Sequence, residues 1–160
     1  ETLITSAMYL SISSFRLSAA KASVKVVTLN SVSIFASATV AAQIHPTKQW
    51  FIEAHQFRIN TSGGIGRPTP EGAHRDGVDF VVVMMLGRHH VKGGETRVFM
   101  ADGPMGVRFV MDEPFSAILL DDAKVIHETT PIQPESGNFS DCYRDTLVLT
   151  FRADSFQSSQ

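Results

Sequence analysis

The sequence contains a single cysteine, Cys142, among its 160 residues. One thiol excludes an intramolecular disulfide and leaves any cysteine-based zinc site without enough ligands. The sequence also lacks a large excess of charge of either sign, because 14 basic and 16 acidic residues give a formal net charge of −2. Such a chain lacks the basic excess of nucleic-acid-binding proteins, and we therefore expect no nucleic-acid partner.

Long hydrophobic runs are missing as well. The longest apolar run, residues 80–86, is far shorter than the roughly 20 residues of a membrane-spanning helix. Hydrophobic residues make up 43% and charged residues 19% of the sequence, which is typical of one globular domain. We therefore expect a cytoplasmic protein that makes no membrane contact.

The first 40 residues differ in composition from the rest. They hold nine serines and one acidic residue, Glu1, beside three basic residues. This pattern is typical of an organelle transit peptide, which would imply import, but a truncated or mispredicted start fits equally well. Residues 31–40 also alternate small polar and apolar side chains, as a weak strand does. We therefore expect an atypical N-terminal segment (1–42), a folded domain (43–154) and a polar tail (155–160).

From residue 43 onward, short apolar runs alternate with Gly, Pro and Asp, which is typical of strands separated by turns. The predicted strands cover residues 50–59, 78–86, 96–100, 106–111, 116–120, 124–127 and 146–151. Their number is close to the roughly eight strands of a double-sheet jelly roll, with little helix between them. The predicted fold class is therefore mainly all-β, a double-stranded β-helix of the jelly-roll or cupin-like type.

One histidine pattern stands out, His74-Arg75-Asp76, between a turn and a hydrophobic run. In an extended chain residues i and i+2 share a face, so His74 and Asp76 project together and can hold adjacent positions on a divalent metal. His127, at the end of a predicted apolar strand, is the best candidate for a third ligand. Two His and one Asp form the facial triad of non-haem Fe(II) oxygenases. The alternative is a turn histidine paired with an aspartate and a separate core histidine.

If the last predicted strand is extended back to residue 144, Arg144 and Thr146 open it and share a face by the same spacing. A guanidinium and a hydroxyl side by side can clamp a carboxylate. Arg152 has the same parity and is the rival clamp, but Arg144 is preferred because a strand's opening residue lies at the barrel mouth. The alternative is an edge-strand arginine that pairs with a nearby aspartate: Asp141, Asp145 or Asp154.

Taken in order, His74-x-Asp76, a distal His127 and Arg144-x-Thr146 resemble the Fe(II)/2-oxoglutarate-dependent dioxygenases. The resemblance is closest to the bacterial enzymes that hydroxylate free aliphatic L-amino acids, such as isoleucine dioxygenase. It runs from about residue 43 to residue 153 and is carried by segments 55–59, 70–77, 93–96 and 144–147. Residues 1–42 do not resemble that family's N-terminal region.

The resemblance implies that the triad of His74, Asp76 and His127 holds Fe(II) and that O2 takes an open position on the metal. Arg144 and Thr146 would bind the far carboxylate of the cosubstrate 2-oxoglutarate. The implied reaction hydroxylates a small molecule, a free L-amino acid, and releases succinate and CO2. Two other classes stay open: a cupin-like metal enzyme that performs hydrolysis or isomerisation, and an inactive dioxygenase fragment.

Several neighbouring residues have two interpretations. Gln56 and Arg58 share one face of the first predicted strand, where they either line the pocket or form a polar outer face. Residues 78, 80 and 82 share the parity of His74 and Asp76 and are expected to form the dry wall of the site. The glycines at 93 and 94 predict a hairpin turn, and the acidic pair at 121 and 122 predicts a turn before the strand of His127.

Overall fold

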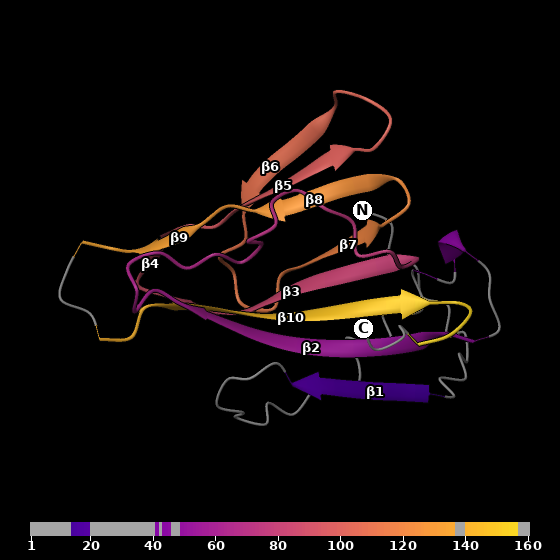
Figure 1. Cartoon of the computed structure of the whole chain (residues 1–160), viewed down its shortest axis with the longest axis horizontal. Helices are drawn as coiled ribbons and strands as arrows, with labels where there is room; N and C mark the ends of the chain where they lie inside the picture. Colours follow the sequence, from indigo (N-terminus) through magenta and orange to yellow (C-terminus); the bar gives the residue numbers. More distant parts are fainter. Residues whose placement is uncertain (1–13, 20–40, 42, 46–48, 137–139, 157–160) are drawn as a thin grey trace.

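Strands make up almost all of the regular secondary structure in the described part of the chain (Figure 1). The computed structural model describes residues 14–19, 41, 43–45, 49–136 and 140–156. The weak strand predicted at 31–40 lies outside the described residues. In chain order the strands are β1 (Ser14–Ala19), β2 (Phe51–Asn60), β3 (Phe80–His89), β4 (Val91–Gly93), β5 (Glu95–Met100), β6 (Gly106–Val110), β7 (Ala117–Asp121), β8 (Val125–Thr129), β9 (Ile132–Pro134) and β10 (Tyr143–Arg152).

The strands form two layers (Figure 1). One layer is a five-stranded sheet with the order β1-β2-β10-β3-β7, and the other contains the sheets β6-β5-β8 and β4-β9. The chain crosses between the layers after β3, β6, β7 and β9, which is the winding of a double-stranded β-helix. The predicted fold class, a mainly all-β jelly roll, is therefore confirmed.

All seven predicted strands correspond to observed ones, with shifted ends. The short strands β4 and β9 were not among the predicted strands, and they pair with each other in the structure. Each has three residues, and they contain Gly93 and Pro134, so neither shows a readable alternation. The glycines at 93 and 94 do not make the predicted hairpin. They join β4 to β5, which pair with β9 and β8 respectively.

Part of the N-terminal segment contributes to this architecture. Strand β1 pairs in parallel with β2 at the edge of the five-stranded sheet, with Ser14 opposite Phe51. Ala41 is fully buried in the apolar core. The domain boundary predicted at residue 42 stays a prediction.

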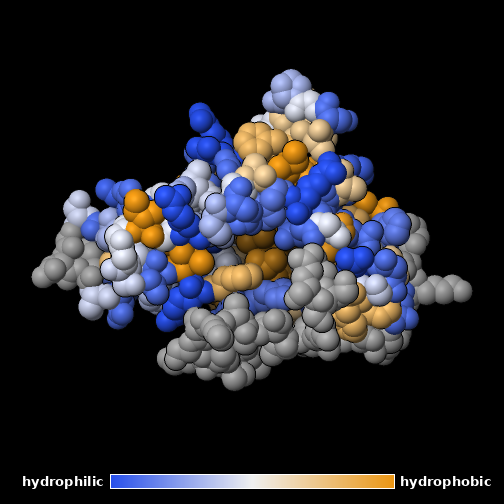
Figure 2. Space-filling model, viewed as in Figure 1, coloured by the Kyte–Doolittle hydropathy of each residue, from blue (hydrophilic) through white to orange (hydrophobic). Residues whose placement is uncertain are grey.

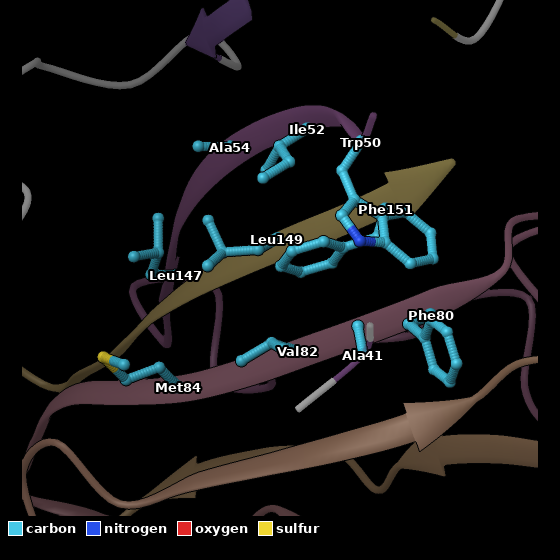
Figure 3. Packing of buried hydrophobic residues seen from close by; sticks show 10 residues of the cluster. All are labelled: Ala41, Trp50, Ile52, Ala54, Phe80, Val82, Met84, Leu147, Leu149 and Phe151. Atoms are coloured by element: carbon cyan, nitrogen blue, oxygen red, sulfur yellow. The ribbon is translucent and has the colours of Figure 1, made fainter. Parts of the chain in front are cut away.

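The apolar core lies on one face of the five-stranded sheet (Figure 3). Its members are Ala41, Trp50, Ile52, Ala54, Phe80, Val82, Met84, Leu147, Leu149 and Phe151. Trp50 meets the rings of Phe80 and Phe151 edge to face, with centroids 5.7 and 6.1 Å away. Because side chains alternate along a strand, Arg144 and Thr146 on β10 point to the opposite face, toward the second layer.

The wall of the site therefore differs from the one predicted. Phe80 and Val82 belong to the apolar core, away from Arg144 and Thr146. Gly77, with φ 73°, turns the chain just before β3. The alternation of side chains between the two faces therefore cannot be counted from Asp76 across this turn into β3. The face toward the second layer carries Val81, Val83 and Met85, which lie opposite Thr150, Val148 and Thr146 of β10.

Apolar atoms reach the surface around the β5–β6 hairpin (Figure 2). The exposed large apolar side chains of this hairpin are Phe99, Met100, Met105, Val107 and Val110. Within the described ranges, no helix has the length and apolar character needed to cross a membrane.

Candidate active site

His74 and His127 are brought together by a backbone bridge. His74 lies between β2 and β3, and His127 lies in β8. Each backbone N–H donates to the other residue's carbonyl oxygen at 3.0 Å, which makes an isolated antiparallel bridge. Residues directly opposite in such a pair project to the same face, and the two ring centroids are 4.6 Å apart. The fold therefore places two imidazoles side by side.

Asp76 completes the group. Its Oδ1 lies 3.9 Å from Nε2 of His74, and its Oδ2 lies 3.4 Å from Nε2 of His127. One ligand atom from each of the three residues lies within 4.8 Å of the others. Ligands bound at about 2.0–2.2 Å and at right angles to each other are about 3 Å apart, so a small contraction would let all three reach one ion.

The position of Asp76 depends on a second aspartate, which the sequence analysis interpreted only as a turn residue. Asp122 is 2% exposed. Its carboxylate accepts the backbone N–H groups of Asp76 at 3.1 Å, Gly77 at 2.8 Å and Val78 at 3.1 Å. A buried carboxylate needs such donors, and here they fix the loop that presents Asp76. The sequence signal was weak, because acidic residues are common in turns.

The orientation of the His74 ring is also fixed. Its Nδ1 lies 3.0 Å from the carbonyl oxygen of Gly72. Because a carbonyl oxygen can only accept, Nδ1 carries a proton, so the neutral form of this ring has its lone pair on Nε2, which faces Asp76. A histidine that donates through one ring nitrogen to a carbonyl is prepared to bind a metal through the other.

Burial acts on both the acidic and the basic members of the group. It raises the pKa of Asp76, and the imidazoles of His127 and His74 oppose that rise. It lowers the pKa of His127, against the attraction of Asp76. His127 is thereby held neutral, which is the form that binds metals. The pocket disfavours an isolated negative charge on Asp76, and a bound cation would offset this.

These residues fit a divalent metal. They offer two nitrogens and one carboxylate, the donor set of the facial triad, which leaves further coordination positions for other molecules. His127 Nδ1 is buried and has no hydrogen-bond partner among the described residues. The other ring nitrogen, Nε2, lies 3.4 Å from Oδ2 of Asp76 and is the one that would bind the ion.

Arg144 is a buried cation that has no counterion among the residues that the structure describes. It is 3% exposed, and its Nε and Nη2 atoms have no hydrogen-bond partner within the described chain. The sequence left open a pairing with a nearby aspartate. Asp145 instead binds Arg58 at 2.6 and 2.8 Å, and Asp154 lies 3.3 Å from Arg152. A buried guanidinium in this state requires an anion that the described residues do not provide.

Two threonines extend this polar region. Thr146 is 3% exposed and lies two residues after Arg144 on the same face of β10. Thr96 on β5 is equally buried, and its Oγ1 has no hydrogen-bond partner in the part of the chain that the structure describes. It stands two residues before Val98, which lies opposite His127. The sequence analysis missed Thr96, because a threonine at the start of a strand carries no special signal.

The other sequence candidates lie outside this group. Arg58 lies on the opposite face from Arg144, with its guanidinium 4.1 Å from the ring of Tyr143. Gln56 shares that face by alternation, so the polar outer face is the interpretation that the structure favours. Arg152, the rival clamp, lies next to Asp154 and 3.4 Å from the carbonyl oxygen of Gly77.

Comparison with known proteins gives a family match. Residues 19–150 match the family model described as 2OG-Fe dioxygenase. The chain is similar to a bsmA homolog from Methylobium petroleophilum PM1, with 52% identity and a TM-score of 0.76 over 83% of this chain and 54% of that one. The chain thus spans about half the length of this relative.

A second solved structure shares the fold. IDO from Bacillus thuringiensis has 19% identity and a TM-score of 0.52, over 62% of this chain and 46% of that one. A likeness at this identity concerns the fold alone. No curated protein matches the chain.

Proposed function

Because the chain belongs to the 2OG-Fe dioxygenase family, we propose that it is part of an Fe(II)- and 2-oxoglutarate-dependent dioxygenase that hydroxylates a small molecule. Family membership implies Fe(II) and 2-oxoglutarate as cofactor and cosubstrate. The observation that carries the proposal is the convergence of His74, Asp76 and His127 within 4.8 Å. Arg144 supports it, because this residue is buried, has no counterion among the described residues and points from the five-stranded sheet toward the layer that contains His127.

The metal ligands in this proposal are His74 Nε2, a carboxylate oxygen of Asp76 and His127. Bound Fe(II) supplies the redox chemistry that couples oxidative decarboxylation of 2-oxoglutarate by O2, with release of succinate and CO2, to hydroxylation of the substrate. The chain's own contribution is to hold the three ligands before the metal arrives. Gly72 orients His74, and Asp122 fixes the loop of Asp76.

The far carboxylate of 2-oxoglutarate would be bound by Arg144 and Thr146, with Thr96 as a further donor. Three buried atoms of this region, Arg144 Nε, Arg144 Nη2 and Thr96 Oγ1, lack hydrogen-bond partners in the described residues. A carboxylate would satisfy both guanidinium nitrogens through a bidentate contact. The same contact would neutralise the buried charge.

The wall beside these groups is apolar. Val81 and Met85 are fully buried on the face of β3 that carries the site, and Val83 lies between them. An apolar wall excludes water, which strengthens the interactions of Arg144 and limits side reactions of a reactive intermediate. The chain therefore provides position, orientation and dryness.

We further propose that the substrate is a free L-amino acid. The support is the sequence resemblance in segments 55–59, 70–77, 93–96 and 144–147 to the bacterial enzymes that hydroxylate such substrates.

The test is succinate release from 2-oxoglutarate with Fe(II), O2 and pooled L-amino acids. The proposal predicts turnover above the background without amino acids, loss of turnover in Asp76→Ala, and normal turnover in Asp121→Ala, which alters a surface carboxylate paired with Lys124. Turnover that needs metal but neither O2 nor 2-oxoglutarate would point to a hydrolase or isomerase. A folded protein that retains no metal would contradict the proposal and favour an inactive fragment.

A further inference from the structure

Arg88 lies directly opposite Arg144 in the ladder of β3 and β10. The two strands change register between Asp145 and Thr146, which lie opposite Gly87 and Met85 respectively. Leu86 is therefore an extra residue, a β-bulge. In a regular strand Met85 and Arg88 would point to opposite faces, but the bulge restores Arg88 to the face of Met85. The bulge thus brings a second arginine to the side that carries the site.

The guanidinium of Arg88 is held on one side only. Its Nη2 donates to the carbonyl oxygens of Val91 at 2.9 Å and Gly93 at 2.7 Å. Its Nη1 is buried and has no hydrogen-bond partner in the described ranges, where no carboxylate pairs with it. The backbone of β4 therefore orients the fork and leaves one nitrogen available to another molecule.

Gly94 shows that Arg88 and Arg144 are close neighbours. A Cβ at this position would lie 3.0 Å from Nη1 of Arg88 and 3.8 Å from Cδ of Arg144. Gly94 also has φ 69°, a conformation that favours glycine. Both side chains thus pass over this glycine. Their proximity also lowers the pKa of Arg144, after the larger effect of burial.

Two neighbouring guanidiniums with buried, unpartnered nitrogens repel each other, and an anion bound between them would offset this repulsion. We propose that Arg88 is the second cationic arm of the 2-oxoglutarate subsite, with its Nη1 donating to the far carboxylate that Arg144 also binds. Arg88 is then a specificity-determining residue, because it favours a 2-oxo acid with a second carboxylate over one without it. This inference rests on the proposed function.

Calorimetric titration of the metal-loaded protein without O2 tests the inference. The ligands are 2-oxoglutarate and 2-oxovalerate, which has a methyl group in place of the far carboxylate. In Arg88→Met we expect 2-oxoglutarate to bind about 10- to 100-fold more weakly, while 2-oxovalerate binding changes less than about threefold. The preference for the dicarboxylate therefore shrinks. Arg88→Lys, which keeps a charge but not the planar fork, should fall between wild type and Arg88→Met.

Arg97→Met is the matched control, because Arg97 is an arginine of β5 already paired with Glu95 at 2.7 Å and Glu128 at 3.2 Å. It should keep the full preference for 2-oxoglutarate. Wild-type preference in both Arg88 variants would overturn the inference and leave the proposed function standing. An equal loss of affinity for both ligands would also overturn the inference, because a residue with a purely structural role would have that effect. If wild type and Arg97→Met bind no 2-oxoglutarate, the proposed function itself fails.

Discussion

The carboxylate of Asp122 accepts the backbone N–H of Asp76 at 3.1 Å. Asp122 follows β7 in the five-stranded sheet, whereas Asp76 belongs to the loop that meets β8 in the other layer. The contact therefore couples the two layers at the point where the candidate metal ligands meet. It lets a rigid sheet position a ligand that lies in a loop.

Asp122→Asn should weaken metal binding and lower stability. An amide presents one acceptor oxygen and an NH2 group to the three N–H donors that Asp122 now satisfies. We expect a loss of about 1–3 kcal/mol in the free energy of unfolding and about 10- to 100-fold in Fe(II) affinity. Denaturant unfolding and anaerobic Fe(II) titration against a chelator measure the two effects.

Asp121→Asn provides the control for this substitution. Asp121 pairs with the exposed Lys124 at 2.7 Å, so its loss should cost less than about 1 kcal/mol and leave Fe(II) affinity unchanged. Unaltered Fe(II) affinity in a folded Asp122→Asn protein would show that the loop of Asp76 does not need this carboxylate.

Arg144→Met should stabilise the ligand-free protein and abolish its response to 2-oxoglutarate. Removing a buried charge that has no counterion in the described part of the chain should raise the free energy of unfolding by about 1–3 kcal/mol. Wild type should gain about 2.7 kcal/mol at 2-oxoglutarate concentrations 100 times the Kd, and the variant should gain none. Thermal unfolding with and without 2-oxoglutarate measures both effects.

Arg152→Met separates the two candidate clamps. Arg152 lies next to Asp154, so its loss should leave the stabilisation by 2-oxoglutarate intact. Loss of that stabilisation in Arg152→Met, together with a normal response in Arg144→Met, would transfer the clamp to Arg152.

The binding of 2-oxoglutarate should be constant from pH 7 to about pH 9 and weaken above about pH 10. Burial, with a smaller effect from Arg88, lowers the pKa of Arg144 to about 10. Above that pH the ligand-free protein loses the positive charge that attracts a carboxylate. Calorimetric titrations across this range give the Kd directly. A Kd that stays constant through pH 10.5 would contradict the lowered pKa of Arg144 in the ligand-free protein.

The same lowered pKa fixes the sign of a stability effect. The unfolded chain keeps the Arg144 proton to higher pH than the folded protein, so the unfolded state binds more protons above about pH 10. The contribution of Arg144 to folding therefore becomes more favourable as pH rises. The stability gap between Arg144→Met and wild type should narrow between pH 8 and pH 10.5, as denaturant unfolding at each pH would reveal.

The fold class was predictable because alternation and turn residues are local signals. The runs that became β2, β3 and β10 have ten residues each in the structure, long enough for their pattern to be read. The shared face of Arg144 and Thr146 follows from the same alternation, since both lie within β10. The three-residue strands β4 and β9 carry too few residues to show it.

Features set by contacts between distant segments were not predictable. The alternation of side chains is interrupted at Gly77, before β3, and again within β3 at the bulge near Leu86. Neither the wall residues nor the inward direction of Arg88 can therefore be predicted by counting alternate residues along the sequence. The three hydrogen bonds of Asp122 join segments more than forty residues apart. The sequence favoured His127 as the third member of the group, but the bridge that holds it beside His74 exists only in the folded chain.

The central claim is that His74, Asp76 and His127 hold Fe(II) next to 2-oxoglutarate. The most direct measurement is the visible absorption of the anaerobic protein with Fe(II) and 2-oxoglutarate. The account predicts a weak metal-to-ligand band in wild type and the loss of this band in His74→Ala and Asp76→Ala. The band should persist in the control His89→Ala, because His89 is an exposed residue of β3. A band that persists in these two variants, or that is missing from the folded wild-type protein, would contradict the claim.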